Sequence, residues 1–164
     1  MKSKVYIETS VISYLTARIS RDIITAAHQQ VTQEWWDFRR KDFDLYVSQL
    51  VIKEAGRGDK AVSEKRLWIL KDIPLLQLND EITDFAKKII SARIIPEKYA
   101  EDSIHIAITT IHNIDYLITW NCRHIANAGI RRNISKLCDQ SGYDIPIICT
   151  PEELMGEIIC GEIK

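Results

Sequence analysis

The chain has 164 residues, 46% of them hydrophobic and 27% charged, which is the composition of an ordinary globular protein. This length suits one domain with a sizeable core. We predict a domain over residues 1–150, with 151–164 as the C-terminal helix and tail of the same domain. The net charge of −1 excludes nucleic-acid binding through bulk positive charge, so any such binding needs a local basic patch.

No apolar run is long enough to cross a bilayer, and the first residues reach Glu8 before an apolar stretch of signal-peptide length develops. We therefore expect a cytoplasmic protein with no membrane partner. The four cysteines have no CxxC spacing. They are interpreted as reduced thiols, because neither a zinc site nor a disulfide framework fits this spacing.

The predicted elements alternate between strands and helices along the whole chain. Residues 4–7 predict a buried strand that stops at Glu8, and Thr9 and Ser10 provide N-cap chemistry for a helix through Leu15. Further strands are predicted at 43–47, 74–78, 115–120 and 147–149. Further helices are predicted at 22–41, 60–71, 99–112 and 125–141, with one capped by Ser48, one capped by Asn79 or Asp80, and a short last one opened by Pro151. This alternation implies βαβ units and a parallel sheet that is covered on both faces.

Polar residues occupy positions from which they could meet at one edge of this sheet. Glu8 directly follows the first predicted strand, and Asn121 follows the fourth. Glu54 and Asp102 lie on intervening helices. Each residue taken alone also fits a bland role, as a helix-start acid, a solvated helix acid or a turn residue. Ligand sites of parallel sheets lie beyond the carboxyl ends of the strands, so the joint order of the four residues indicates a shared site.

At these residues the sequence resembles the PIN domain family, and within it the VapC-type ribonuclease toxins of toxin–antitoxin pairs. The resemblance covers roughly residues 3–150. The motifs that carry it are Val-Tyr-Ile-Glu-Thr-Ser-Val-Ile at 5–12, Val-Ile-Lys-Glu at 51–54, Glu-Asp-Ser-Ile-His-Ile-Ala at 101–107 and Leu-Ile-Thr-Trp-Asn at 117–121.

The resemblance implies a three-layer α/β/α sandwich with a central parallel sheet, and a site in which three or four acids bind Mg²⁺ or Mn²⁺ for RNA cleavage. By this resemblance Glu8, Glu54 and Asp102 are the metal ligands, and Asn121 is the fourth catalytic position. Such a chain would be a metal-dependent endoribonuclease that pairs with a separate antitoxin protein.

This chemistry suits the residue types. Cleavage of a phosphodiester develops charge on phosphoryl and leaving oxygens, and divalent ions can neutralise that charge and activate the attacking water. Mg²⁺ prefers oxygen ligands and keeps several waters, so a few carboxylates suffice. Clustered carboxylates repel one another when metal is absent. An acid cluster at a sheet edge is therefore interpreted as a cation site.

The chain departs from the family pattern at two positions. Glu8 stands where the family usually has Asp, and the extra methylene moves the carboxylate outward. Asn121 stands where an acid is common, which removes one negative charge and predicts a weaker second metal site. These departures keep open an alternative, a catalytically weak or inactive PIN-fold module that binds RNA or a protein. A nucleotide-binding domain is disfavoured, because no glycine-rich loop follows the first strand.

Other candidate contacts have an equally simple structural explanation. Thr9 and Ser10 could bind a phosphate or only cap a helix, and Arg123 could contact RNA. His105, on the Asp102 side of its helix, and His124 are possible bases, although an acid-ligated metal needs none. Further basic residues that could contact phosphates are Arg57, Lys60, Arg131 and Arg132. Trp120 could stack on a base or could end its strand in the core.

The adjacent residues Trp35 and Trp36 point about 100° apart on a helix. The two rings therefore cannot both enter the same core. One of them is available for a partner or for a contact between two copies of the chain. Together with the family resemblance, this predicts a homodimer.

Overall fold

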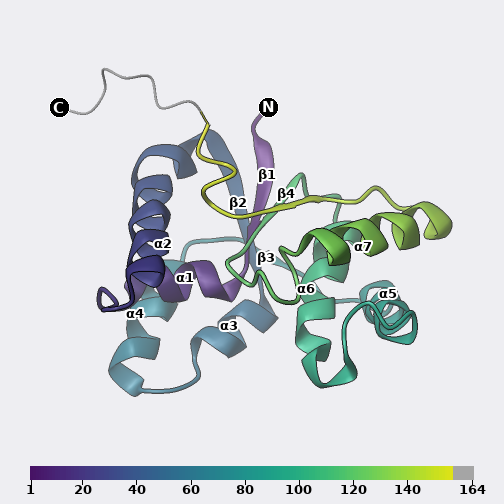
Figure 1. The fold of residues 1–164 in the computed structure, drawn as a ribbon, viewed down its shortest axis with the longest axis horizontal. Coiled ribbons are helices and arrows are strands. Elements are labelled where there is room, and N and C mark those ends of the chain that lie inside the picture. The colour runs from purple at the N-terminus through teal and green to yellow at the C-terminus, as the bar shows by residue number, and fades with distance from the viewer. Residues whose placement is uncertain (157–164) are drawn as a thin grey trace.

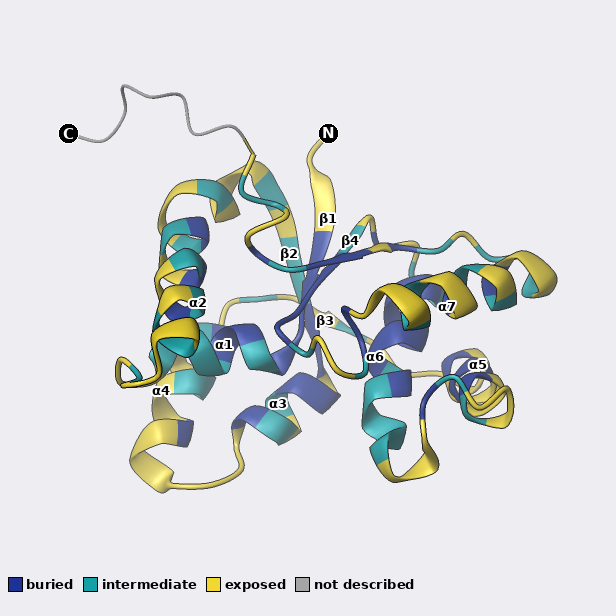
Figure 2. Ribbon diagram, viewed as in Figure 1, coloured by how far each residue is buried: buried dark blue, intermediate teal, exposed yellow. Residues whose placement is uncertain are grey.

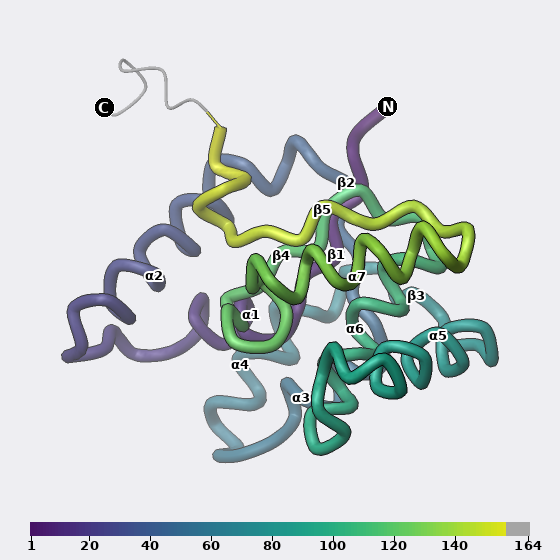
Figure 3. Tube along the Cα trace, turned by 45° about the vertical axis from the view of Figure 1, so that its right-hand side comes forward, coloured from purple at the N-terminus to yellow at the C-terminus, as the bar shows by residue number. Residues whose placement is uncertain are grey.

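The fold is a three-layer α/β/α sandwich (Figure 1). The structure is a computed structural model that describes residues 1–156. Helices α1, α2 and α4 lie on one side of the sheet, and α5, α6 and α7 lie on the other, an arrangement that the rotated view also displays (Figure 3). The predicted fold class is confirmed.

The central sheet is parallel throughout and has five strands in the order β3-β2-β1-β4-β5. The strands are β1 (Ser3–Ile7), β2 (Phe43–Ser48), β3 (Leu75–Leu76), β4 (Tyr116–Ile118) and β5 (Ile147–Cys149). Val5, Tyr6 and Ile7 of the middle strand are fully buried, because helices cover both faces of a parallel sheet. Figure 2 shows the dark blue, buried residues gathered along the strands and the inner faces of the helices.

The strand order places a switch point between β1 and β4. From β1 the chain moves outward to β2 and β3, then returns to the other side of β1 for β4 and β5. The connections that leave these two neighbouring strands therefore diverge, and an opening forms beyond their carboxyl ends. Glu8 follows β1 at this point, and Thr119 and Asn121 follow β4.

Side-chain caps set the starts of most helices. The helices are α1 (Thr9–Thr16), α2 (Ile23–Glu34), α3 (Gln49–Ala55), α4 (Lys60–Leu70), α5 (Asp80–Ser91), α6 (Ala100–Ile111) and α7 (Ala128–Ser141). Ser48 caps α3 and Asn79 caps α5 as predicted, each accepting a backbone N–H from the first turn. Helix α1 differs, because Glu8 itself is the N-cap, and Thr9 and Ser10 are already helical.

Several predicted boundaries were too long. Helix α2 ends at Glu34 and continues as a π turn over Trp35–Arg39 and a 3₁₀ turn over Arg40–Asp42. Helix α7 begins at Ala128 because Asn127 caps it, accepting the N–H groups of Gly129 and Ile130. The predicted strands at 74–78 and 115–120 shorten to the paired residues of β3 and β4.

The short helix predicted from Pro151 is wrong, since residues 151–155 form turns. Only isolated bonds form there, from Leu154 N–H to Thr150 O and from Met155 N–H to Glu152 O, and Gly156 has a φ of 75° that ends the turn. Residues 157–164, including Cys160, lie outside the described part. No helix within 1–156 is long and apolar enough to span a membrane.

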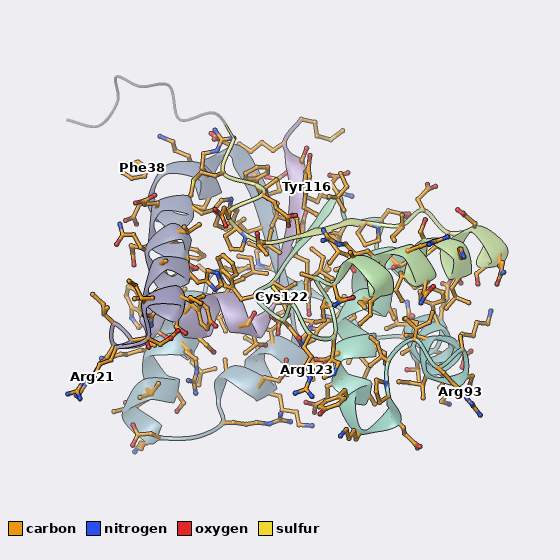
Figure 4. All side chains as sticks on the ribbon, viewed as in Figure 1. Arg21, Phe38, Arg93, Tyr116, Cys122 and Arg123 are labelled. Carbon is orange, nitrogen blue, oxygen red and sulfur yellow. The ribbon has the colours of Figure 1, made fainter. Side chains whose placement is uncertain are left out.

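The two adjacent tryptophans have different environments. Trp35 is fully buried, stacked on Phe43 with ring centroids 6.0 Å apart. Trp36 is partly buried and has the Arg40 guanidinium 4.7 Å from its ring centre. The exposed aromatic ring of this segment is Phe38, which is 66% exposed (Figure 4).

Candidate metal centre

Glu8 is held at the end of β1 by hydrogen bonds to only one of its carboxylate oxygens. The residue is 5% exposed. Oε2 accepts the backbone N–H of Ser10 at 3.0 Å, the Ser10 hydroxyl, and the Thr119 hydroxyl at 2.8 Å. Within residues 1–156 Oε1 accepts no hydrogen bond. One oxygen is thus fixed by the protein, and the other is left for a ligand.

Glu54, on α3, contacts α1 and α6 through a single oxygen. Oε1 accepts the Thr9 hydroxyl at 2.8 Å and lies 2.6 Å from His105 Nε2. The other ring nitrogen, Nδ1, lies 2.7 Å from the Tyr6 hydroxyl, which is 2.8 Å from Ser48 Oγ. This buried chain of polar groups joins β1, β2, α3 and α6, so the position of Glu54 depends on the core of the sheet.

The Glu54 and His105 side chains stabilise each other's charged forms. Burial by itself would raise the pKa of the Glu54 carboxyl, but the hydrogen bonds from His105 and Thr9 outweigh it and lower that pKa. Burial would lower the pKa of His105, but the hydrogen bond to Glu54 and the nearby carboxylates raise it. Burial raises the pKa of the Tyr6 hydroxyl well above its usual range, so Tyr6 stays neutral in this chain.

Asp102 lies in the first turn of α6, and its contacts compensate less well than those of Glu54 for the burial of a charged carboxylate. Its carboxylate is 3.3 Å from His124 Nδ1, and the two side chains are 16% and 13% exposed. The His124 ring packs on Tyr99 with centroids 3.9 Å apart. Burial raises the pKa of the Asp102 carboxyl, although His105 and the Asn121 side chain act to lower it. The ionised form of Asp102 therefore lacks a partner that fully replaces water.

Asn121 is anchored within the loop that follows β4. Its backbone N–H donates to Thr119 Oγ1 at 2.9 Å, and its Oδ1 accepts the His124 N–H at 3.0 Å. Its side chain also lowers the pKa of Asp102. The amide oxygen already has a backbone donor, so Asn121 acts here as a neutral neighbour of Asp102.

A group of potential metal ligands lies at this edge. Glu8, Glu54 and His105 each offer one ligand atom, and these atoms lie within 4.8 Å of one another. Asp102 lies three residues before His105 on α6, on the same face of that helix. The donor set, with one oxygen of each glutamate free of hydrogen bonds within 1–156, fits a divalent cation.

The predicted site residues Glu8, Glu54, Asp102 and Asn121 thus lie around one edge of the sheet. His105, which the sequence suggested only as a possible base, lies there too, in contact with Glu54. The sequence places His105 three residues after Asp102, whereas its complete burial and its contact with Glu54 are visible only in the structure. This spacing places both side chains on one face of a helix.

The hydroxyl groups of Thr9 and Ser10 hold the carboxylates in place. Thr9 donates to Glu54, and Ser10 donates to Glu8 while accepting the Trp120 N–H at 2.8 Å. Their role in the described structure is to orient the two glutamates. Arg123 is exposed on the loop after β4 (Figure 4).

Trp120 belongs to the core rather than to an exposed base-stacking surface. It is 8% exposed, and its ring stacks on His28 with centroids 4.1 Å apart and on Tyr14 with centroids 6.0 Å apart. Its Nε1 donates to Thr32. The indole ring is therefore already packed against other aromatic rings inside the protein.

Two of the basic candidates are engaged elsewhere. Arg57 makes a two-point contact with Glu101 at 2.8 and 3.0 Å, and Arg131 donates to the carbonyl of Ile148 and pairs with Glu153. These contacts leave Arg123 as the exposed cation closest in sequence to Asn121.

Comparisons with known proteins identify a similar fold. No family model matches the sequence, and no curated protein matches it. A search of solved structures finds the VapBC2 complex of Rickettsia felis, crystallised with a DNA fragment from its promoter. The alignment has a TM-score of 0.55 at 13% identity, and covers 88% of this chain and 96% of that chain.

An identity this low demonstrates similarity of fold alone. The parallel sheet, its flanking helices and its polar carboxyl edge define the chain as an α/β/α protein of the PIN-like fold.

Proposed function

We propose that this chain is a metal-dependent endoribonuclease and the toxin of a toxin–antitoxin pair. The observation that carries the proposal is the gathering of Glu8, Glu54 and Asp102 beyond the carboxyl ends of β1 and β4, beside a group of ligand atoms within 4.8 Å. Glu8 and Glu54 each keep one carboxylate oxygen that accepts no hydrogen bond within residues 1–156, which leaves that oxygen for a cation.

In this proposal Glu8 and Glu54 hold Mg²⁺ or Mn²⁺ through the oxygens that accept no hydrogen bond within residues 1–156, and Asp102 completes the site. A bound divalent ion supplies charge neutralisation at the phosphoryl group and lowers the pKa of water. Ser10, Thr119 and Thr9 keep the two glutamates in position through their hydroxyls. This prior arrangement reduces the reorganisation needed in the transition state.

The exposed side chain of Arg123 is the proposed contact to the RNA backbone. A guanidinium on the loop of Asn121 can pair with a phosphate beside the metal centre. The hydroxyls of Thr9 and Ser10 are already engaged with the glutamates. We therefore assign them to the site itself, where any contact to the phosphate is secondary.

An antitoxin partner is proposed by analogy with the VapBC2 complex. An apolar groove between α1 and α4 offers a surface for such a partner; it is lined by Leu15, Ala61, Trp68 and Ile69, with Trp68 67% exposed. Exposed aromatic residues of this kind are common at protein interfaces. Self-association as a homodimer is also proposed, and Phe38 is a more accessible aromatic ring for it than Trp35.

The second candidate is a PIN-fold module that binds RNA or protein without cleaving it. Asn121 favours this alternative, because its side-chain oxygen accepts the His124 N–H and the residue adds no negative charge. A site with one acid fewer holds its cation less tightly.

Metal-dependent cleavage of RNA tests the proposal. The wild-type chain, Asp102→Asn and Asp139→Asn are incubated with several RNAs in Mg²⁺, in Mn²⁺ and in a chelator. Asp139 is an exposed acid on α7, so its substitution is the matched control. We expect cleavage by wild type and by Asp139→Asn only when metal is present. Equal rates for wild type and Asp102→Asn exclude this site, and cleavage by none of them favours the binding module.

A further inference from the structure

We propose that His105 binds the metal ion directly through Nε2, and that this nitrogen ligand makes the site prefer Mn²⁺ to Mg²⁺. The inference rests on the proposed metal centre. It changes the ligand set expected from the sequence resemblance, which contained carboxylates and an amide but no imidazole.

The first argument is position. Nε2 of His105 lies 2.6 Å from Glu54 Oε1 and belongs to the group of ligand atoms that also includes Glu8. Ligand atoms on opposite sides of one ion, with bonds of about 2.1 Å, lie about 4.2 Å apart. A group already within 4.8 Å can therefore surround one ion after small side-chain movements.

The second argument is the environment of the other ring nitrogen. Nδ1 lies 2.7 Å from the Tyr6 hydroxyl, and that hydroxyl lies 2.8 Å from Ser48 Oγ. Metal-bound histidines usually have their second nitrogen held in this way, which fixes the ring and its tautomer. The Tyr6 hydroxyl can donate to Nδ1 or accept from it. The same contact thus supports Nε2–H donating to Glu54 without metal, and a free Nε2 lone pair when metal binds.

The third argument is burial. His105 is fully buried, and within residues 1–156 its two nitrogens contact only Tyr6 and Glu54. The ring therefore has one nitrogen anchored on strand β1, through Tyr6, and the other at the Glu54 carboxylate that borders the site.

The predicted selectivity follows from ligand chemistry. Mg²⁺ prefers oxygen ligands in near-ideal octahedral geometry, whereas imidazole is a good ligand for first-row transition ions. Mn²⁺ shares the carboxylate chemistry of Mg²⁺ and also accepts nitrogen. Two glutamates and one histidine therefore form a mixed site in which Mn²⁺ gains an interaction that Mg²⁺ uses poorly.

Calorimetric titration and pulsed electron paramagnetic resonance test this assignment on the full chain. Wild type is expected to bind Mn²⁺ more tightly than Mg²⁺, because the imidazole ligand favours the transition ion. Its Mn²⁺ complex is expected to have the nitrogen-14 modulation of a coordinated imidazole. This signal needs no substitution and is independent of nuclease activity.

The informative variant is His105→Gln, whose side-chain N–H can still donate to Glu54 but which offers no ring nitrogen. We expect it to lose the nitrogen-14 signal and the preference for Mn²⁺. His112→Gln, at the other end of the same helix, is the control and should keep both. Circular dichroism checks that each variant is folded.

Three outcomes overturn the inference. Mn²⁺ bound without nitrogen-14 modulation would make His105 only a positioning residue for Glu54. An unchanged Mn²⁺ to Mg²⁺ ratio in folded His105→Gln would lead to the same conclusion. Absence of any metal binding by wild type would remove the centre altogether. Either of the first two outcomes would refute the role of His105 as a ligand without refuting the proposed nuclease activity, because cleavage is measured separately.

Discussion

The two halves of the site are built differently. The inner half consists of Glu8, Glu54 and His105, which hydrogen bonds tie to β1, β2 and β4. The outer half consists of Asp102, on the first turn of α6, and of Asn121 and His124, on the loop after β4. The inner half shares its hydrogen-bond partners with the core of the sheet, whereas two of the three residues of the outer half lie on a loop.

The pKa shifts of the two halves have opposite directions. Hydrogen bonds outweigh burial at Glu54 and lower the pKa of its carboxyl, whereas burial dominates at Asp102 and raises the pKa there. The folded chain therefore accommodates a charged Glu54 but penalises a charged Asp102. A bound cation would remove that penalty. Substitutions in the inner half should thus affect both folding and function, and those in the outer half mainly function.

The largest expected effect separates activity from stability. Asp102→Asn and Glu54→Gln should each raise the activation free energy of metal-dependent cleavage by several kcal/mol. The cleavage rate should therefore fall by at least about a hundredfold. Only Glu54→Gln should lower the unfolding midpoint in chelator, because Asp102→Asn removes a charge that burial disfavours. Scanning calorimetry beside a cleavage assay measures both. A drop in midpoint for Asp102→Asn as large as that for Glu54→Gln would contradict the comparison.

Metal should stabilise the folded chain. A ligand that binds only the native state at 100 times its Kd adds about 2.7 kcal/mol to the free energy of unfolding. Thermal unfolding with increasing Mg²⁺ or Mn²⁺ measures this, and Asp139→Asn should respond as wild type does. A midpoint unchanged at every concentration counts against a competent site.

The buried polar chain should be costly to break. Tyr6→Phe leaves Ser48 Oγ and His105 Nδ1 without the hydroxyl that they contact, which should reduce the free energy of unfolding by about 1–3 kcal/mol. His124→Asn, in the outer half, removes a partly exposed contact to Asp102 and should cost about 1 kcal/mol or less. Urea unfolding in chelator measures both variants, and equal losses would remove the distinction between the halves.

The pH dependence of metal-free stability should also reveal the inner half. The lowered pKa of Glu54 gives a contribution that is present above its ordinary value of 4.5 and is lost as pH falls. The raised pKa of His105 gives a contribution that is present below 6.5 and is lost as pH rises through the folded value. The stability difference between wild type and Glu54→Gln should therefore be largest between these values. Urea titrations from acid to neutral pH measure this stability difference. A difference that grows steadily with pH would contradict a charged pair between Glu54 and His105.

The smallest expected effect concerns Glu8. Glu8→Asp restores the residue usual at this position in the resembling family, and cleavage should persist or rise. The shorter side chain can still accept the Ser10 N–H, as Asp22 does for Thr25 on α2. Steady-state cleavage at saturating metal measures the outcome. Loss of activity would mean that the inner half is fitted to the longer side chain.

Much of the fold could be predicted because its signals are local. The apolar run at Val5, Tyr6 and Ile7, and caps such as Ser48 and Asn79, each specify structure within a few residues. Boundaries failed where tertiary contacts decide them, as at the π turn that buries Trp35 and at the short strand β3, which pairs only where β2 is beside it.

The candidate site could be predicted only in part. Glu8 and Asn121 were located because they end strands, and parallel strands end at one edge. The contact between His105 and Glu54 joins residues 51 positions apart, and no local pattern encodes that separation. Likewise, the hydrogen bond from Thr9 to Glu54 depends on the packing of α1 against α3.

The central position of β1 has a consequence for the newly made chain. The backbone N–H of Glu8 donates to the carbonyl of Ile118, and its carboxylate accepts the hydroxyl of Thr119, which is 111 residues later in the sequence. A chain still being synthesised therefore possesses Glu8 and Glu54 long before it possesses β4 and the Asn121 loop. Closing so long a loop is slow compared with forming local helices. Any activity of this site consequently begins only after β4 and the Asn121 loop have left the ribosome.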